Sequence, residues 1–252
     1  MIKAKDYIDI VLPNYNSSRY LKQTINSVIM QTYKKWQLII IDDCSDNKTL
    51  NLLKKFHKHK KIKIYYQKKN YGAGFCRNLA MKKSKSPYIA FIDSDDIWNK
   101  NKLEKQINFM KKNHYSFSYT YYKTFGLKKR FITPPLRFDY KSFIKNTSIG
   151  TSTIMVERKK LNNIKFTNSK ICEDYYFKCK LLKRVNFAFC LNKFLTKYRI
   201  RNDSMQSNNI KNIFWIWKIN KDFNKLSLLN NLFSIINISI NSIKKYGGKN
   251  FF

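Results

Sequence analysis

The strongest constraint on the fold is that strand-sized apolar runs alternate with helical patterns along residues 1–100. The runs lie at residues 7–12, 36–41, 62–67 and 88–92. After the first run, Leu21, Ile25 and Val28 recur at the spacing of a helix. The second run (WQLIII) is nearly continuous, which is typical of a parallel strand covered on both faces. This alternation predicts βαβ units and a parallel α/β sheet.

Acidic residues are rare and clustered, which makes them the most informative side chains. The chain has 15 Asp and Glu against 51 Lys and Arg, and eight of the 15 fall in three short segments: 42–46 (DDCSD), 93–96 (DSDD) and 173–174 (ED). Adjacent carboxylates repel each other, so this grouping destabilises a fold unless cations or hydrogen-bond donors offset it. Lysines could supply part of that, and a hard divalent cation bound to substrate phosphates is the sharper explanation.

Two of these clusters follow predicted strands. Asp42 and Asp43 come directly after the second strand and Asp93 after the fourth, while residues 13–16 follow the first. Open parallel sheets bind ligands at the carboxyl ends of their strands. We therefore expect a ligand site at this edge, independently of any family.

The net charge of +36 limits the classes of molecule that this chain is expected to bind. Lys accounts for 43 of the 51 basic residues and is spread along the chain, whereas nucleic-acid sites favour Arg gathered on one face. We expect that the chain does not bind nucleic acid, and we favour an anionic substrate or an anionic membrane surface as its partner.

Five cysteines without a CxxC pair predict a reduced, cytoplasmic chain without zinc. Neither a signal peptide nor an apolar span of about 18 residues is expected.

Known phosphate-binding motifs do not fit. The segment 72–77 (GAGFCR) has two glycines of a dinucleotide fingerprint but Arg where the third belongs, and GxxxxGK[ST] does not occur. The sequence therefore disfavours NAD and P-loop ATP chemistry.

Five motifs follow one another in residues 6–205: IVLPNYN at 10–16, IIDDCSD at 40–46, NYG at 70–72 with CRN at 76–78, FIDSDDIW at 91–98, and EDYYF at 173–177. Together they resemble glycosyltransferase family 2, the inverting, nucleotide-sugar-dependent enzymes of the GT-A fold. Cys44 and Cys76 stand where that family commonly has Gly and Ala.

The resemblance implies a Rossmann-like, mostly parallel sheet flanked by helices. We expect a catalytic domain over residues 1–205, with a nucleotide-binding half at 1–100 and an acceptor-side half at 101–205. A helical extension would follow at 206–252. Residues 208–246 read as mostly helical, with apolar residues on one side and lysines around it. That segment either packs on the catalytic domain or forms an interfacial helix at a membrane.

For the nucleotide, the resemblance implies that Asp42 and Asp43 hold the base, one of them accepting the imino hydrogen of uracil; which one is left open. Pro13 and Tyr15 would line the pocket, with Tyr15 stacking on the base. The alternatives are helix capping for the acids and ordinary packing for Pro13 and Tyr15.

For the diphosphate, residues 93–95 resemble the family's DxD motif. Asp95 would bind Mn²⁺ or Mg²⁺, and Asp93 or Asp96 would contact the ribose or the water shell of the metal. The alternative is a strand-end turn with a capping Asp.

Three arginines match family positions near the phosphates. Arg77 has a planar guanidinium suited to bidentate phosphate contact, and Arg199 and Arg201 match a segment that closes over the diphosphate. The alternative for Arg77 is a surface arginine on a short helix. His57, His59 and His114 are expected to be solvated.

For the reaction, Asp174 matches the family's catalytic base, and Glu173 would support it or contact the acceptor. A position in the first turn of a helix keeps such a carboxylate ionised. That position is also the alternative explanation, because acids stabilise helix starts without any catalytic role.

The combined prediction is a cytoplasmic glycosyltransferase of the hexosyltransferase type, peripheral on the inner face of the cytoplasmic membrane. It would transfer a sugar from a UDP-sugar to a saccharide or lipid-linked acceptor in the synthesis of a bacterial surface polysaccharide such as lipopolysaccharide or capsule. One alternative is a non-enzymatic basic protein that binds nucleic acid or membrane. Another is a sugar-1-phosphate nucleotidylyltransferase, although the Gly-rich loop expected after its first strand is missing here.

Overall fold

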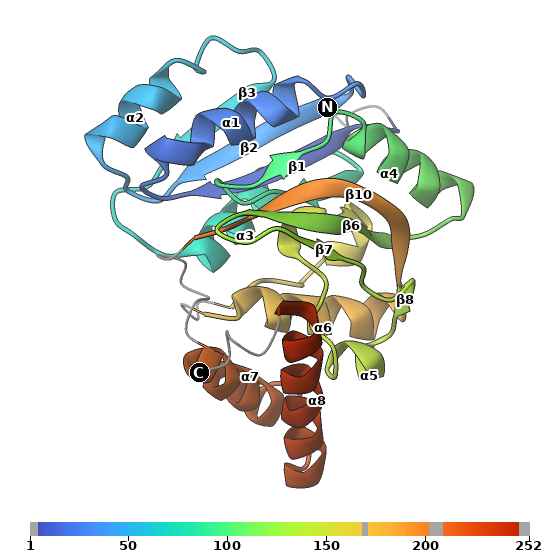
Figure 1. Cartoon of the computed structure of the whole chain (residues 1–252). Helices are drawn as coiled ribbons and strands as arrows, with labels where there is room; N and C mark the ends of the chain where they lie inside the picture. The colour runs from blue at the N-terminus through green and yellow to red at the C-terminus, as the bar shows by residue number, and fades with distance from the viewer. Residues whose placement is uncertain (1–4, 168–170, 202–208, 247–252) are drawn as a thin grey trace.

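The computed structural model describes residues 5–167, 171–201 and 209–246 (Figure 1). Within them one mixed sheet runs in the order β3-β2-β1-β4-β9-β6-β10-β5, with β7 paired to β6 and β8 to β10. Helices cover both faces of this sheet. The prediction of a sheet flanked by helices is confirmed.

The first part of the chain forms the parallel side of the sheet. Its elements are β1 (Ile8–Asn14), α1 (Ser18–Ile29), β2 (Trp36–Asp42), α2 (Asn47–Lys54), β3 (Ile62–Tyr66), α3 (Ala73–Lys83) and β4 (Tyr88–Phe91). Strand β1 pairs in parallel with both β2 and β4. The predicted boundary after residue 12 is wrong, because Pro13 and Asn14 continue β1 in register with Ile41 and Asp42.

The apolar runs of β1 and β2 are continuous because both faces of these strands are buried. Ile10 and Leu12 belong to a core with Leu21 and Ile25 of α1. Val11 points to the opposite core, which contains Cys76 and Ala80 of α3. Helices α1 and α3 therefore cover opposite faces of the same strands.

The second part of the chain extends the sheet mainly with antiparallel strands. Its elements are β5 (Ile97–Trp98), α4 (Lys102–Lys112), β6 (Phe117–Gly126), β7 (Arg130–Ile132), β8 (Arg137–Phe138), α5 (Tyr140–Phe143), β9 (Met155–Glu157), α6 (Glu173–Val185), β10 (Ala188–Ile200), α7 (Asn209–Asp222) and α8 (Leu228–Tyr246), with 3₁₀ turns at Thr151–Thr153 and Arg158–Leu161. Strand β9 joins the two parts by pairing antiparallel with β4 and β6.

Helices α6, α7 and α8 lie on the side of the sheet away from α1 (Figure 1). Ile216 and Ile219 of α7 and Ile238 of α8 belong to the same buried cluster as Phe177 of α6. The division into a catalytic domain and a helical extension stays a prediction. In the described part of the chain, no helix combines the length and apolarity needed to cross a bilayer.

Candidate active site

The loops after β1 and β2 are tied together by the side chains that end these strands. Asn14 Nδ2 donates to Asp42 Oδ1 at 2.6 Å, and the amide of Ser45 donates to Asp42 Oδ2 at 3.1 Å. Cys44 adopts φ +65°, a left-handed conformation that glycine favours, which explains why Gly is common at this family position.

Asp43, next to Asp42 in the chain, has a different structural role. Asp43 accepts from the backbone amides of Tyr71 and Gly72, at 2.9 and 2.7 Å. Gly72 has φ +91°, so the turn that leads into α3 needs a glycine there. Both oxygens of Asp43 thus hold the start of α3 in place.

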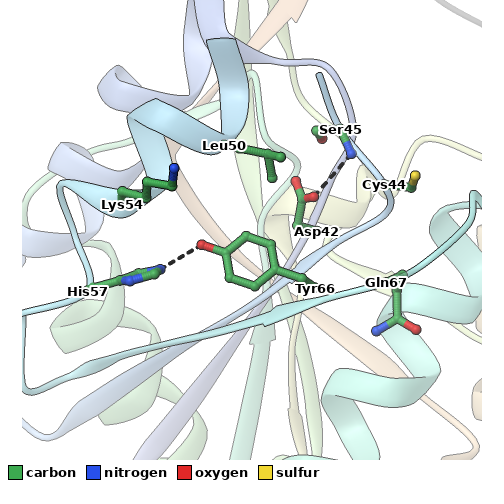
Figure 2. Close-up of a pocket in the computed structure, with 8 residues that line it drawn as sticks. All are labelled: Asp42, Cys44, Ser45, Leu50, Lys54, His57, Tyr66 and Gln67. Atoms are coloured by element: carbon green, nitrogen blue, oxygen red, sulfur yellow. Dashed lines mark hydrogen bonds between the residues drawn. The ribbon is translucent and has the colours of Figure 1, made fainter. Parts of the chain in front are cut away.

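Asp42 instead lines a cavity of about 340 Å³ between α2 and β3 (Figure 2). The other lining residues are Cys44, Ser45, Leu50, Lys54, His57, Tyr66 and Gln67. His57 Nε2 lies 2.6 Å from the Tyr66 hydroxyl across this cavity. The expectation that His57 is merely solvated is therefore incomplete. A cavity of this volume is in the range of small-molecule sites.

Pro13 and Tyr15, both expected to line the pocket, differ in exposure. Pro13 is buried inside β1, whereas Tyr15, on the loop that follows, is 51% exposed. Only Tyr15 is therefore open to stack on a ligand.

The segment 93–96 follows β4 and is held by hydrogen bonds and an ion pair with distant parts of the chain. The Asp93 amide donates to Ser152 Oγ at 3.0 Å. Asp95 Oδ2 lies 3.1 Å from Arg201 Nε. Asp96 is fully buried and accepts from the Arg199 amide at 2.9 Å.

Arg199 and Arg201 come from the end of β10 and just beyond it, and both face the acidic segment. Arg199 Nε donates to the Asp95 carbonyl at 2.9 Å, and its guanidinium lies over the rings of Tyr20 and Phe125. These residues were expected in a closing segment. Arg199 lies in β10, and its positive charge favours the ionised form of Asp95. Closure of this segment over the diphosphate stays a prediction.

The electrostatics of this segment fit a hard cation. Burial, with the neighbouring Asp93 adding to it, raises the pKa of Asp95 to about 6. Burial, with Asp95 and then Asp93 adding to it, raises the pKa of Asp96 well above its ordinary value, and hydrogen bonds from Ser152 and Arg199 only partly offset this. By distance and angle, Asp96 Oδ2 has no hydrogen-bond partner among the described residues. The protein thus gathers more carboxylate here than its own donors neutralise. Such oxygen ligands suit Mg²⁺ or Mn²⁺.

A complete metal site is not formed by side chains alone. Within the described ranges, no group of three or more His, Cys, Asp or Glu side chains converges as a metal site. A cation here would need ligand oxygens from a bound phosphate or from water as well.

Arg77 of α3 joins two of the acidic clusters. Its Nη2 donates to Asp93 Oδ1 and its Nη1 to Glu173 Oε1, both at 2.6 Å. The side chain is 5% exposed and lies against the Phe166 ring. Burial alone would lower the pKa of Arg77, but the two carboxylates outweigh it and raise it. The Arg77 guanidinium was expected to bind phosphate, but in this structure it binds two carboxylates. It thereby joins Asp93 to Glu173, which are 80 positions apart in the chain.

Asp174, at the start of α6, is held by two other side chains. Its Oδ2 accepts from Lys178 Nζ at 2.6 Å and from Thr151 Oγ1 at 2.8 Å. Burial alone would raise the pKa of Asp174, but Lys178 reverses this and lowers it to about 2. The hydrogen bonds of Asp174 in the described structure come from side chains, and Cys172 is the N-cap residue of α6. Its catalytic role and its alternative role, an acid that stabilises the helix start, both stay predictions.

The sequence did not reveal three residues that support this site. Ser152 and Thr151 sit in the 3₁₀ turn between α5 and β9, and only the fold brings them to Asp93 and Asp174. Lys178 could have been found, because it stands four residues after Asp174 on the same helix.

The comparisons with known proteins agree with this geometry. Residues 9–185 match the family model described as Glycosyl transferase family 2. The chain is 32% identical over 250 residues to the putative teichuronic acid biosynthesis glycosyltransferase TuaG of Bacillus subtilis, covering 97% of this chain and 99% of TuaG. It is 34% identical to the Escherichia coli UDP-Glc:alpha-D-GlcNAc-diphosphoundecaprenol beta-1,3-glucosyltransferase WfgD, covering 96% of each.

Solved structures show the same fold at lower identity. Residues 1–349 of S. aureus TarS, in complex with UDP-GlcNAc, superpose with a TM-score of 0.74 at 21% identity, over 94% of this chain and 73% of that one. The Pyrobaculum calidifontis mannosyltransferase PcManGT, in complex with GDP-Man and Mn²⁺, gives a TM-score of 0.69 at 10% identity, over 97% and 71%. With the GT-A fold, the family match and the joined acidic clusters in agreement, this chain belongs to glycosyltransferase family 2.

Proposed function

We propose that this glycosyltransferase transfers a sugar from a UDP-sugar to a saccharide or lipid-linked acceptor, with inversion, in the synthesis of a bacterial surface polysaccharide. The observation that carries the proposal is the Arg77 bridge, which joins the Asp93 cluster to the Glu173–Asp174 pair. A cavity lined by Asp42 supplies a place for the nucleotide. The names of TuaG and WfgD and the UDP-GlcNAc complex of TarS support the same class of donor and product.

For the nucleotide, we assign Asp42 rather than Asp43 to the base. Asp42 borders the cavity, and its carboxylate can accept a further hydrogen bond beside those from Asn14 and Ser45. Asp43 already accepts from two backbone amides and is assigned to positioning. Tyr15, exposed on the adjacent loop, would stack on the base.

For the diphosphate, Asp95 and Asp93 would hold Mn²⁺ or Mg²⁺, with Arg201 close by. The cation would neutralise the charge of the leaving nucleoside diphosphate. We assign Asp96 and Arg199 to positioning, because Asp96 is fully buried and binds the Arg199 amide. Arg77 is likewise assigned to orienting Asp93 and Glu173.

For the reaction, Asp174 would accept the proton of the acceptor hydroxyl as that oxygen attacks the anomeric carbon. Lys178 keeps Asp174 ionised at neutral pH and fixes its orientation together with Thr151. The low pKa limits how far Asp174 draws the proton before the diphosphate departs. Glu173 would be held toward the acceptor by Arg77.

We further propose that the enzyme works in the cytoplasm, against the inner face of the cytoplasmic membrane, where a lipid-linked acceptor would be presented. The charge of +36 supports this, because lysines near an anionic leaflet are attracted to it.

The test is to incubate the purified chain and Mn²⁺ with radiolabelled UDP-glucose, UDP-galactose and UDP-GlcNAc, and to follow UDP release with and without an undecaprenyl-diphosphate sugar. We expect slow release from one donor and faster release when the acceptor is added. Release from none of the donors, with GDP-mannose turned over instead, would contradict the UDP assignment. Formation of a nucleotide sugar from a sugar 1-phosphate and UTP would favour the nucleotidylyltransferase alternative.

A further inference from the structure

Helix α8 turns its apolar side chains away from the protein. Leu229 is 78% exposed, and the other residues of this row are between 41% and 54% exposed. They recur at spacings of three and four, so they form one face of the helix. We call this face the α8 stripe: Leu229, Leu232, Phe233, Ile236, Ile240 and Ile243.

The opposite face of α8 points inward and combines polar side chains with two isoleucines, Ile235 and Ile238, that pack against the core. Asn231 and Ser234 are each 1% exposed and accept hydrogen bonds from Asn220 of α7, at 3.1 and 3.0 Å. Ser234 donates to the Ile144 carbonyl, and Asn241 donates to the Lys145 carbonyl at 3.0 Å. A surface helix normally turns its wide apolar face inward, whereas α8 buries two isoleucines and leaves the six residues of the stripe exposed. The α8 stripe is therefore not needed to hold the helix in place.

The charges around the stripe are those of an anion-binding surface. Residues 228–243 contain no charged side chain, whereas Lys225 precedes them and Lys244 and Lys245 follow. Residues 209–246, which form α7, α8 and the loop between them, contain six lysines and one acid, Asp222. A second copy of this chain fits this surface poorly, because it would bring two molecules of charge +36 together.

We propose that the α8 stripe docks on an anionic lipid bilayer. The helix would lie in the plane of the interface with the stripe at the boundary between headgroups and acyl chains, and the lysines would contact lipid phosphates. Helix α8 lies at the end of the molecule opposite α1 and α2 (Figure 1).

Docking in this way orients the helix that carries Asp174. Tyr175, the next residue, donates from its hydroxyl to Asn220 Oδ1 at 2.7 Å, and Asn220 is the residue that binds Asn231 and Ser234 of α8. The stripe and α6 are thus joined through one buried polar network. That this presents Asp174 to a lipid-linked acceptor rests on the proposed function, whereas the docking itself does not.

The test compares two double variants with matched exposure. Leu229→Gln with Ile236→Gln replaces the two most exposed side chains of the stripe (78% and 54%), while Met30→Gln with Leu127→Gln replaces apolar side chains of similar exposure (66% and 56%) elsewhere. Each full-length protein is mixed with phosphatidylcholine vesicles containing roughly one third phosphatidylglycerol, and with pure phosphatidylcholine vesicles, and is then floated. Melting temperatures confirm that the variants fold.

We expect the wild type and the Met30/Leu127 variant to float with the anionic vesicles, and the stripe variant to partition at least about tenfold more weakly. Equal flotation of all three proteins would overturn the proposal, because diffuse charge would then suffice. A wild type that does not float but sediments as a dimer, with the stripe variant a monomer, would also overturn it. UDP release in solution should be unchanged in both variants, so failure of the docking is distinguishable from failure of the proposed function.

Discussion

At the scale of single residues, the carboxyl group of Asp174 separates catalysis from donor binding. In Asp174→Asn the side chain keeps its shape but cannot take a proton, so transfer should fall by ~10²–10⁴-fold. Binding of UDP with Mn²⁺ should stay near that of the wild type, because Asp93 and Asp95 are untouched. Both quantities are measured on one preparation, by transfer of radiolabelled sugar and by calorimetry. Retained transfer would make Asp174 a structural residue.

Lys178 provides the matched variant, because Lys178→Met removes the same ion pair but keeps the carboxylate. Burial raises the pKa of Asp174, and Lys178 is the main group that lowers it. Without Lys178, we expect this pKa to rise above the usual aspartate value of about 3.9. Since the base must be ionised, the ratio of variant to wild-type transfer should fall as the pH is lowered from 8 to 5. A ratio that stays constant with pH would show that Lys178 does not control the ionisation of Asp174.

Asp95 is the residue on which the metal proposal depends. Asp95→Asn removes a charged oxygen ligand, so the Mn²⁺-dependent part of UDP-sugar affinity should be lost together with activity. Asp46→Asn is the control, because Asp46 caps α2 by accepting from the Thr49 amide and Asn caps about as well. Full activity of the wild type in EDTA would contradict the metal assignment directly.

How much of this site the sequence predicts depends on where each residue lies in the chain. The Asp42, Asp93 and Asp174 clusters are visible because acids are rare and these ones follow strands or open a helix. The pairing of Arg77 with Asp93 and Glu173, in contrast, depends on how α3 and α6 approach each other. Thr151 and Ser152 have no local pattern at all, since only the path of the chain through the sheet gives them a partner.

At the scale of elements, strands β1 to β4 were predictable, whereas β10, which pairs in parallel with β6, was not. Both faces of β1 and β2 are buried, so each is one apolar run. Strand β10 shifts register on both sides of Phe194, and the exposed Asn192 and Lys193 interrupt its alternation. A bulged strand of this kind loses the period of two by which strands are recognised.

The contact of α3 with the start of α6 gives a prediction at the same scale. A Cβ on Gly74 would overlap the Thr167 carbonyl oxygen and lie 3.2 Å from Glu173 Cγ. Gly74→Ala should therefore destabilise the protein by roughly 1–3 kcal/mol and lower transfer by moving Glu173. In Gly150→Ala the nearest contact is an ordinary 3.5 Å, so it should change stability by less than about 0.5 kcal/mol. Urea unfolding of both variants makes the comparison, and equal stability would contradict the close approach.

At the scale of the whole molecule, one of the 51 basic residues is fully buried without a carboxylate partner among the described residues. Lys102 is fully buried at the start of α4, where its Nζ donates to Gln106 Oε1 at 2.6 Å and lies 4.1 Å from the Trp98 ring centre. No described carboxylate pairs with it. Burial accordingly lowers the pKa of Lys102 to about 7.

This lowered pKa predicts how global stability depends on pH. Between pH 7 and the unfolded-state pKa near 10.4, the unfolded chain binds a proton at Lys102 that the folded chain has released, so the contribution of Lys102 to stability rises with pH. Burial raises the pKa of Cys76 and Cys179, so their contribution to stability falls with pH above about pH 9. The effect of Lys102 is therefore best measured between about pH 7 and 8.5. Relative to Lys102→Met, which cannot titrate, the wild type should gain roughly 1.5 kcal/mol of unfolding free energy across that window. Urea denaturation at constant ionic strength measures the difference. A difference that does not change with pH would mean that Lys102 stays protonated in the fold, held by Gln106 and Trp98.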